Sequence, residues 1–191
     1  MRSKTRKYLI FYLFYLSITI NISMASFHTK TFTKHDDYMT PKSAWEAIEK
    51  FIPKDKVIWE PFAGNGNSKK FLTELGFDVI SNEEDFFENN RGEIIITNPP
   101  FSKKQEVVKK LKELGKPFII ICPTPMLVTK YFRELFSDEE ERIQIIIPRS
   151  RIHFMKLVDG KVPEGWKNAC NFDCFYYCWK MNLPQDINWL S

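Results

Sequence analysis

The sequence predicts an α/β fold in which helices cover a mostly parallel sheet. From Val57 onward, short β-branched or apolar runs alternate with segments of helical period, which is the pattern of such a sheet. Gly64 and Asn98 each follow one of these runs, at the strand ends where open α/β sheets bind ligands. The 191 residues are 43% hydrophobic and 27% charged, which is typical of one globular domain and excludes disorder over most of the chain.

Six runs are expected to be strands, and three segments are expected to be helices. The strands are residues 57–60, 77–80, 93–97, 118–122, 143–147 and 172–181. The helices are residues 68–75, 102–114 and 126–136. The first helix ends at Gly76 and the second at Gly115, as glycine commonly ends helices. Ser102 and Gln105 have the spacing of a capping box at the start of the second helix.

The first 25 residues differ from the rest of the chain. Basic residues precede an apolar run over 8–22, and small residues follow it, which is typical of a secretory signal peptide or a short signal anchor. The run is shorter than the ~20 residues of a membrane span. Three interpretations stay open: a targeting segment, a buried N-terminal helix, or an upstream extension before a working start at Met24. We treat residues 1–25 as a signal-like or non-native extension outside the fold.

The charge balance excludes a protein that coats nucleic acid non-specifically. Lys and Arg number 28 against 24 Asp and Glu, but four of the basic residues precede Met24, so the remainder is neutral. The segment from Arg149 to Lys167 is a local exception, with five basic residues against two acidic ones. We expect nucleic-acid contacts from Arg149 and Arg151 in this segment, the alternative being a hairpin with ordinary solvated charges.

A glycine turn follows the first expected strand. Residues 60–66 read Glu-Pro-Phe-Ala-Gly-Asn-Gly and lead into a helix. Glycine lets the backbone approach a ligand closely, at φ values that other residues avoid. The turn therefore lies where a nucleoside cofactor would bind, although any tight strand-to-helix turn can use glycine.

Asn98-Pro99-Pro100-Phe101 ends the apolar run over 93–97. Two prolines stiffen the backbone, so the Asn98 side chain and the Pro99 carbonyl are held in a fixed geometry. An exocyclic amine can donate its hydrogens to these two oxygens, which leaves its lone pair directed at an electrophile. Phe101 offers a ring face for stacking on a planar base. The alternative is a plain strand that ends at proline.

Cys170, Cys174 and Cys178 do not have zinc-site spacing. Their Cys-x3-Cys-x3-Cys pattern lacks Cys-x2-Cys pairs, and the surrounding run has the composition of a strand. Together with Cys122 they are too few for a disulfide framework in a chain of this length. We expect buried free thiols and no metal site.

The glycine turn and the Asn-Pro-Pro-Phe loop together resemble the motifs of the S-adenosylmethionine-dependent amino-methyltransferases. The small phage- and virus-type DNA N6-adenine methyltransferases are the most similar, over roughly residues 35–181. The resemblance implies a Rossmann-like methyltransferase sheet, mostly parallel with an antiparallel final strand, over residues 35–181, followed by a tail over 182–191. It also implies S-adenosylmethionine as cofactor and Asn98, Pro99, Pro100 and Phe101 as catalytic residues. The positions that match the family's cofactor site are Tyr38, Thr40, Pro41, Pro61, Phe62, Gly64, Gly66, Asp85 and Phe86. Phe154 resembles the second aromatic that stacks on the flipped base.

The chain departs from the family pattern in two ways. The family's acidic residue for the ribose hydroxyls is absent after the second strand, where Glu83 could substitute for it. The segment between Phe101 and Phe154 is also too short to hold a separate recognition domain. Sequence choice must then be weak, made by loops, or supplied by a partner subunit.

These observations predict an enzyme that methylates the N6 amine of adenine in DNA. Because base extrusion from a duplex costs a few kcal/mol, single strands or distorted duplexes are the preferred substrates. The alternatives are an RNA adenine enzyme, a protein glutamine enzyme, or a catalytically idle subunit that binds the cofactor. Glutamine enzymes typically end the loop in Tyr, so Phe101 favours adenine. The expected location is intracellular, without stable membrane association of the catalytic domain.

Overall fold

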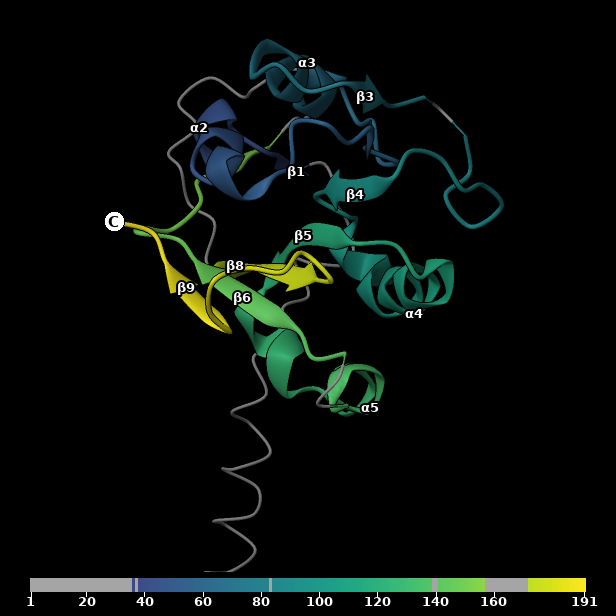
Figure 1. Cartoon of the computed structure of the whole chain (residues 1–191), viewed down its shortest axis with the longest axis vertical. Coiled ribbons are helices and arrows are strands. Elements are labelled where there is room, and N and C mark those ends of the chain that lie inside the picture. The colour runs from purple at the N-terminus through teal and green to yellow at the C-terminus, as the bar shows by residue number, and fades with distance from the viewer. Residues whose placement is uncertain (1–35, 37, 83, 139–140, 157–171) are drawn as a thin grey trace, which may run out of the picture. The chain divides into compact units, whose positions relative to one another are not determined.

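Residues 36, 38–82, 84–138, 141–156 and 172–191 are described by a computed structural model, in which His35–Ser191 form one compact unit. Seven strands form one sheet in the order β3-β2-β4-β5-β8-β6-β9 (Figure 1). They are β2 (Ile58–Trp59), β3 (Val79–Ile80), β4 (Ile94–Thr97), β5 (Phe118–Pro123), β6 (Gln144–Ile147), β8 (Cys174–Trp179) and β9 (Ile187–Trp189). Within these strands only β8 is antiparallel to its neighbours, β5 and β6. The predicted Rossmann-like class, mostly parallel with an antiparallel strand over 172–181, is confirmed.

Helices cover both faces of the sheet (Figure 1). They are α2 (Lys42–Glu46), α3 (Asn67–Glu74), α4 (Lys104–Leu114) and α5 (Lys130–Phe136), with the 3-10 turns η1 (Glu49–Phe51), η2 (Phe101–Lys103) and η3 (Thr124–Val128). Side chains alternate along a strand, and in β5 Phe118 and Ile120 belong to the core that also contains Val108 of α4 and Phe132 of α5. On the opposite face, the Tyr176 hydroxyl of β8 donates to the Ala44 carbonyl of α2 at 2.7 Å.

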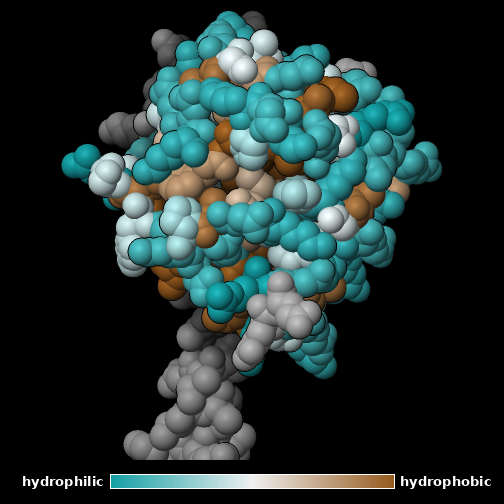
Figure 2. Space-filling model, in the orientation of Figure 1, coloured by the Kyte–Doolittle hydropathy of each residue, from teal (hydrophilic) through white to brown (hydrophobic). Residues whose placement is uncertain are grey.

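Aromatic side chains make up much of the core beneath α4 and α5. Phe118, Phe136 and Trp179 are mutually in ring contact, with centroids 5.8–6.1 Å apart. Burying a side chain of this size contributes about 1.5–3 kcal/mol. The sheet is therefore a firm base for the loops at its edge. The face of the molecule in Figure 2 is mainly hydrophilic, with small apolar areas between hydrophilic side chains.

The helix starting near Ser102 differs from its predicted form. A 3-10 turn comes first, and α4 begins at Lys104 with Lys103 as its N-cap. Ser102 does not form the capping box with Gln105, because its hydroxyl donates instead to the carboxylate of Asp36. The predicted helix end at Gly115 is confirmed, with a left-handed φ of 68°.

Besides the 3-10 turns, four short elements have no counterpart among the expected ones. Strand β1 (Tyr38–Met39) pairs antiparallel with β7 (Met155–Lys156) in a separate ribbon, and α2 follows β1 directly. The fourth is β9, which lies within residues 182–191, expected as a tail, and pairs parallel to β6 at the sheet edge. Elements of two to five residues are too short for a hydrophobic period to show in the sequence.

Some sequence-based expectations fall outside the described residues: the extension over 1–25, Glu83 and Cys170. Cys178 is a buried free thiol in β8, as expected, and burial raises its pKa. Cys174 of β8 is buried as well. Across the described ranges no group of three His, Cys, Asp or Glu residues is placed to hold a metal ion. No helix in these ranges is long and apolar enough to cross a membrane.

Candidate active site

The glycine turn and the Asn98 loop lie side by side at one edge of the sheet. Strands β2 and β4 are adjacent and parallel, with Ile58 opposite Ile94 and Trp59 opposite Ile95. Both strands therefore end at the same edge, and the turn after β2 meets the loop after β4. This is the position at which open α/β sheets bind their ligands.

Glu60 joins the two strand ends from beneath. Its side chain is 1% exposed, and its Oε1 accepts hydrogen bonds from the Thr97 hydroxyl at 2.5 Å and the Phe62 amide at 3.0 Å. Burial raises the pKa of Glu60 from 4.5 to about 7, although both hydrogen bonds act to lower it. Sequence reasoning assigned Glu60 no role. The available signal is that an acid and a hydroxyl each end a buried apolar strand.

The two polar atoms of the Asn98 side-chain amide differ in their contacts. Its Nδ2 donates to the Tyr38 carbonyl at 3.0 Å, which fixes the direction in which the amide points. Its Oδ1 is buried and has no hydrogen-bond partner among the described residues. A buried acceptor without a partner costs free energy, so this atom is placed for a donor that comes with a ligand.

The segment that contains β1 also holds the start of the η2 turn. Asp36 Oδ1 accepts the Ser102 amide at 3.1 Å, and Asp36 Oδ2 accepts the Ser102 hydroxyl. Asp36 and Tyr38 thus hold the Asn98 loop at two points, at Ser102 and at the Asn98 amide. Asp36 has no apolar pattern around it that could have indicated this contact in the sequence.

Four aromatic rings gather over the loop. Tyr38, Phe101, Phe154 and Phe172 are all in pairwise ring contact, with centroids 5.5–6.3 Å apart. Phe101 and Phe154, predicted to sandwich a base, meet edge to face at 84° and leave no parallel slot between them. The stacked pairs are instead Tyr38 with Phe101 and Phe154 with Phe172. Phe172 was expected only as a strand residue, and its place in this cluster depends on contacts far apart in sequence.

A cavity of about 270 Å³ lies between the glycine turn and the Asn98 loop. Its lining residues are Asp36, Tyr38, Met39, Thr40, Phe62, Ala63, Gly64, Asn65, Asn67, Ser68, Asn98 and Pro100. The hydroxyl of Thr40 is buried and lacks a partner within the described part of the chain. The cavity therefore offers polar groups both near the turn and at the Asn98 amide.

The structure brings only some of the predicted cofactor residues to this cavity. Tyr38, Thr40, Phe62 and Gly64 line it, whereas the predicted residues that do not are Pro41, Pro61, Gly66, Asp85 and Phe86.

Three of the residues away from the cavity have a local structural role. Gly66 has φ 80° and is the N-cap of α3. Phe86 is 3% exposed and packs on Trp59 and Phe62 in the core. Asp85 is exposed, and its Oδ1 accepts the Phe87 amide at 2.8 Å.

The predicted basic residues lie away from this cavity. Arg149 and Arg151 line a second and larger one, of about 990 Å³. Arg151 binds Asp173 with both its Nε, at 2.7 Å, and its Nη2, at 3.1 Å. This guanidinium holds the pKa of Asp173 below its ordinary value. Arg151 is therefore committed to an ion pair, whereas Arg149 forms none with the residues that the structure describes.

Comparisons with known proteins give structural likeness only. No protein-family model matches the chain, and no curated protein matches it significantly. It is similar to the crystal structure of a dimethyladenosine transferase from Plasmodium falciparum, with 13% identity and a TM-score of 0.44, over 74% of this chain and 62% of that one. It is also similar to a protein from Listeria monocytogenes described as a class I S-adenosylmethionine-dependent methyltransferase, with 14% identity and a TM-score of 0.48, over 81% and 65%. The chain spans slightly under two thirds of each.

Proposed function

We propose that the chain transfers the methyl group of S-adenosylmethionine to the N6 amine of adenine in DNA. The observation that carries the proposal is the buried, unpartnered Oδ1 of Asn98 beside a cavity at the end of β4, with the amide oriented by Tyr38. An acceptor fixed in this way, together with the Pro99 carbonyl, suits a ligand amine better than a hydroxyl, because an amine has two hydrogens to donate and a hydroxyl has one.

Two residues of the loop together orient the amine. Asn98 Oδ1 accepts one amine hydrogen, and the Pro99 carbonyl accepts the other, so the lone pair of the nitrogen is directed at the methyl donor. S-adenosylmethionine supplies an electrophilic methyl group when it is bound. The amine needs no base before attack, because its excess proton is acidic after transfer and passes to water. Glu60 holds the two strand ends together and does not line the cavity.

The cavity beside Gly64 fits the polar end of such a cofactor. Thr40 presents a buried hydroxyl without a described partner, Asp36 presents a carboxylate, and the turn exposes backbone at Gly64. Gly64 has φ 51°, and a Cβ there would stand 3.4 Å from Met39 Sδ, another lining atom. A side chain at this position would extend into the space proposed for the cofactor.

Gly64→Asp should therefore abolish the binding of S-adenosylmethionine measured by calorimetry. Gly76→Asp is the matched control, because Gly76 also has a positive φ, of 84°, but lies outside the cavity. Both variants place a side chain at a positive φ and add the same charge. Equal affinities in two folded variants would contradict the cofactor assignment.

The base would bind against the aromatic cluster of Tyr38, Phe101, Phe154 and Phe172. Stacking on such rings contributes about 1–3 kcal/mol per base. Since the rings are in mutual contact, we propose that the extruded base is admitted by a shift of the cluster, with Phe101 and Phe154 as its contacts. DNA, in single-stranded form, is the proposed partner, with a partner subunit for sequence recognition and an intracellular site of action.

The deciding experiment is incubation of the full chain with isotopically labelled S-adenosylmethionine and three matched substrates: single-stranded DNA, duplex DNA and RNA. Nucleoside mass spectrometry should find N6-methyladenine, most strongly from single-stranded DNA. Label in RNA alone would assign the enzyme to RNA adenine. Cofactor binding without transfer to any strand or to glutamine peptides would identify an idle subunit.

A further inference from the structure

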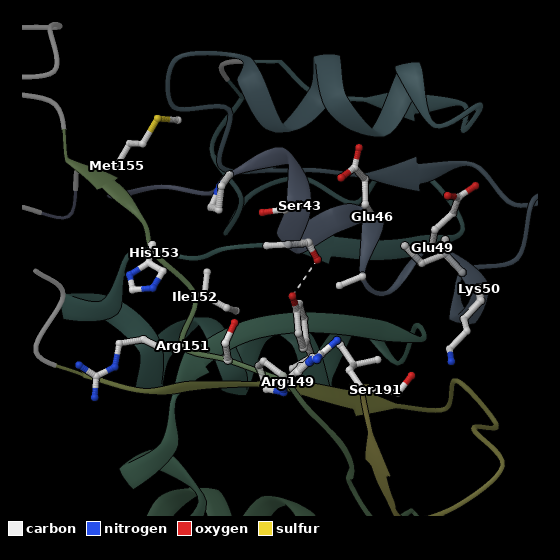
Figure 3. A pocket seen from close by; sticks show the side chains of 18 of the residues that line it. Ser43, Glu46, Glu49, Lys50, Arg149, Arg151, Ile152, His153, Met155 and Ser191 are labelled. Atoms are coloured by element: carbon white, nitrogen blue, oxygen red, sulfur yellow. Dashed lines mark hydrogen bonds between the residues drawn. The ribbon is translucent and has the colours of Figure 1, made fainter. Parts of the chain in front are cut away.

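The larger cavity, of about 990 Å³, lies between two walls on the α2 side of the sheet. One wall is α2 and η1, and the other is the segment from Pro148 to Met155 after β6. Tyr176, which is hydrogen-bonded to Ala44, also lines it. In Figure 3, Arg149 and Lys50 come from opposite walls, and His153 and Ser43 line the end near β7.

The charges in this cavity do not cancel. Of the two carboxylates on the α2 wall, Glu49 pairs with Lys54 at 2.7 Å. Glu46 lies 4.0 Å from Lys42, whose closer partner is Glu74 at 2.8 Å. Figure 3 shows both carboxylates pointing away from Arg149.

Arg151 is likewise paired, with Asp173. Arg149 and Lys50 have no ion-pair partner among the residues that the structure describes. The cavity therefore retains two exposed cations from opposite walls, which suits an anionic ligand.

The larger cavity and the proposed active site are bordered by the same short segments. Pro41 and Met155 line it, whereas the neighbouring residues Tyr38, Met39 and Thr40 line the smaller cavity beside Asn98. Met39 and Met155 are paired in the β1–β7 ribbon. The same ribbon thus borders both cavities.

We propose that this cavity binds the phosphodiester backbone of a single strand next to the target base, with Arg149 and Lys50 as phosphate contacts. The inference rests on the proposed function. A volume of about 990 Å³ is at the upper end of the roughly 300–1,000 Å³ of ligand pockets, enough for a few nucleotides and too small for a duplex. Arg151 acts as a positioning residue, which anchors the wall segment to Asp173. DNA and RNA strands share this backbone chemistry.

The test is a salt titration of binding to single-stranded DNA, measured by fluorescence anisotropy with the full chain. Each lost phosphate contact reduces the slope of log affinity against log salt by about 0.7 for a single strand. Arg149→Gln and Lys50→Gln should each lower the slope by about this amount, and the double variant by about twice as much. Arg133→Gln and Lys109→Gln are matched controls on α5 and α4, at exposed positions outside both cavities, and should leave the slope unchanged.

Strand form and length give a second readout. Affinity should rise as nucleotides are added on one side of the adenine and level off after a few. Complementary strand added to form a blunt duplex should remove the dependence on Arg149 and Lys50. An RNA strand of the same sequence shows whether the sugar matters, since a phosphate groove should bind both.

The proposal that the larger cavity is a groove for the strand backbone and the proposal of methyl transfer can fail separately. Methyl transfer with slopes that are equal in the groove variants and the controls would overturn the groove and leave the reaction standing. Slope losses confined to Arg149 and Lys50, without methyl transfer to any strand, would support the groove and overturn the reaction. A duplex that binds with the same dependence on both residues would also overturn the groove as proposed.

Discussion

Two loops of this sheet, one after β4 and one after β6, are built in opposite ways. The loop over 98–101 is held on every side: Asn98 by the Tyr38 carbonyl, the adjoining Ser102 by Asp36, and the preceding Thr97 by Glu60. The loop over 148–154 alternates, with Ile152 and Phe154 buried and Arg151 and His153 exposed.

The difference indicates what each loop can contribute. A group fixed before a ligand arrives can orient a reacting atom, because little free energy is spent on ordering it. Long exposed cations instead attract phosphate over a distance set by salt, and they carry little geometric information. We infer that the first loop provides the chemistry and the second provides strand affinity.

The comparison is tested most strongly at Phe154, one of the two buried residues of the loop over 148–154. Phe154 is 0% exposed within the aromatic cluster, so Phe154→Ala should lower the free energy of unfolding by about 3–5 kcal/mol. Phe154→Trp should cost about 1–3 kcal/mol, because the cluster has no space for a larger ring. Denaturant titration measures both, and the exposed neighbour His153→Ala should change stability by less than about 0.5 kcal/mol. A Phe154→Ala variant as stable as His153→Ala would mean that Phe154 stands in an open base slot.

The second prediction concerns Asn98. Asn98→Ala should slow methyl transfer about a hundredfold or more while cofactor affinity is retained, since one positioned hydrogen bond in a transition state contributes ~2.7–4 kcal/mol. Single-turnover kinetics separate the two effects. The control is Asn90→Ala, at an exposed asparagine outside both cavities. An unchanged rate in Asn98→Ala would mean that the loop has only a structural role.

Much of this fold could be predicted from local sequence, and much of the site could not. Strands β4 and β5 are runs of Ile and Phe that stand out at once, and Gly76 and Gly115 end their helices in left-handed conformations. Each of these signals is contained within a few consecutive residues of the sequence.

The contacts that complete the site join distant segments. Asp36 meets Ser102, and Tyr38 contacts Phe154 through a two-residue ribbon without periodicity. The prediction for Arg151 illustrates the same limit, because a charge in a basic run gives no indication that Asp173 will pair with it.

The third prediction is a pH dependence of the free energy of unfolding, which arises from the buried carboxyl group of Glu60. Its pKa is about 7 in the folded protein and near 4.5 in the unfolded chain. The folded state therefore keeps a proton that the unfolded state releases between these values, and stability present below pH 4.5 is lost as pH rises through about 7. The loss is of the order of 3 kcal/mol, at ~1.4 kcal/mol per pKa unit.

Glu60→Gln should remove this loss, because the amide keeps an acceptor oxygen and does not titrate. The free energy of unfolding of the variant, relative to that of the wild type, should rise by about 3 kcal/mol between pH 4.5 and 8. Glu93→Gln is the control, because the Lys56 hydrogen bond lowers the pKa of Glu93. The contribution of Glu93 to the free energy of unfolding therefore changes at more acidic pH, and it has the opposite sign. Parallel pH profiles of wild type and Glu60→Gln would contradict a raised pKa.

The smallest expected effects come from the polar contacts that hold the two loops at the surface. Asp36 accepts two hydrogen bonds from Ser102, whereas Asp173 and Arg151 form a half-exposed ion pair. A double-mutant cycle of Asp36→Ala with Ser102→Ala should give a coupling of about 1 kcal/mol that survives added salt, since the bond that the cycle isolates has an uncharged hydroxyl as its donor. The cycle of Arg151→Ala with Asp173→Ala should give about 0.2–1 kcal/mol and decline as salt is added. Only the first cycle should also slow methyl transfer, because only Ser102 adjoins the loop that orients the amine. If both couplings decline equally with salt, the β4 loop is held no more firmly than the β6 loop, and orientation of the amine must come from the bound ligand.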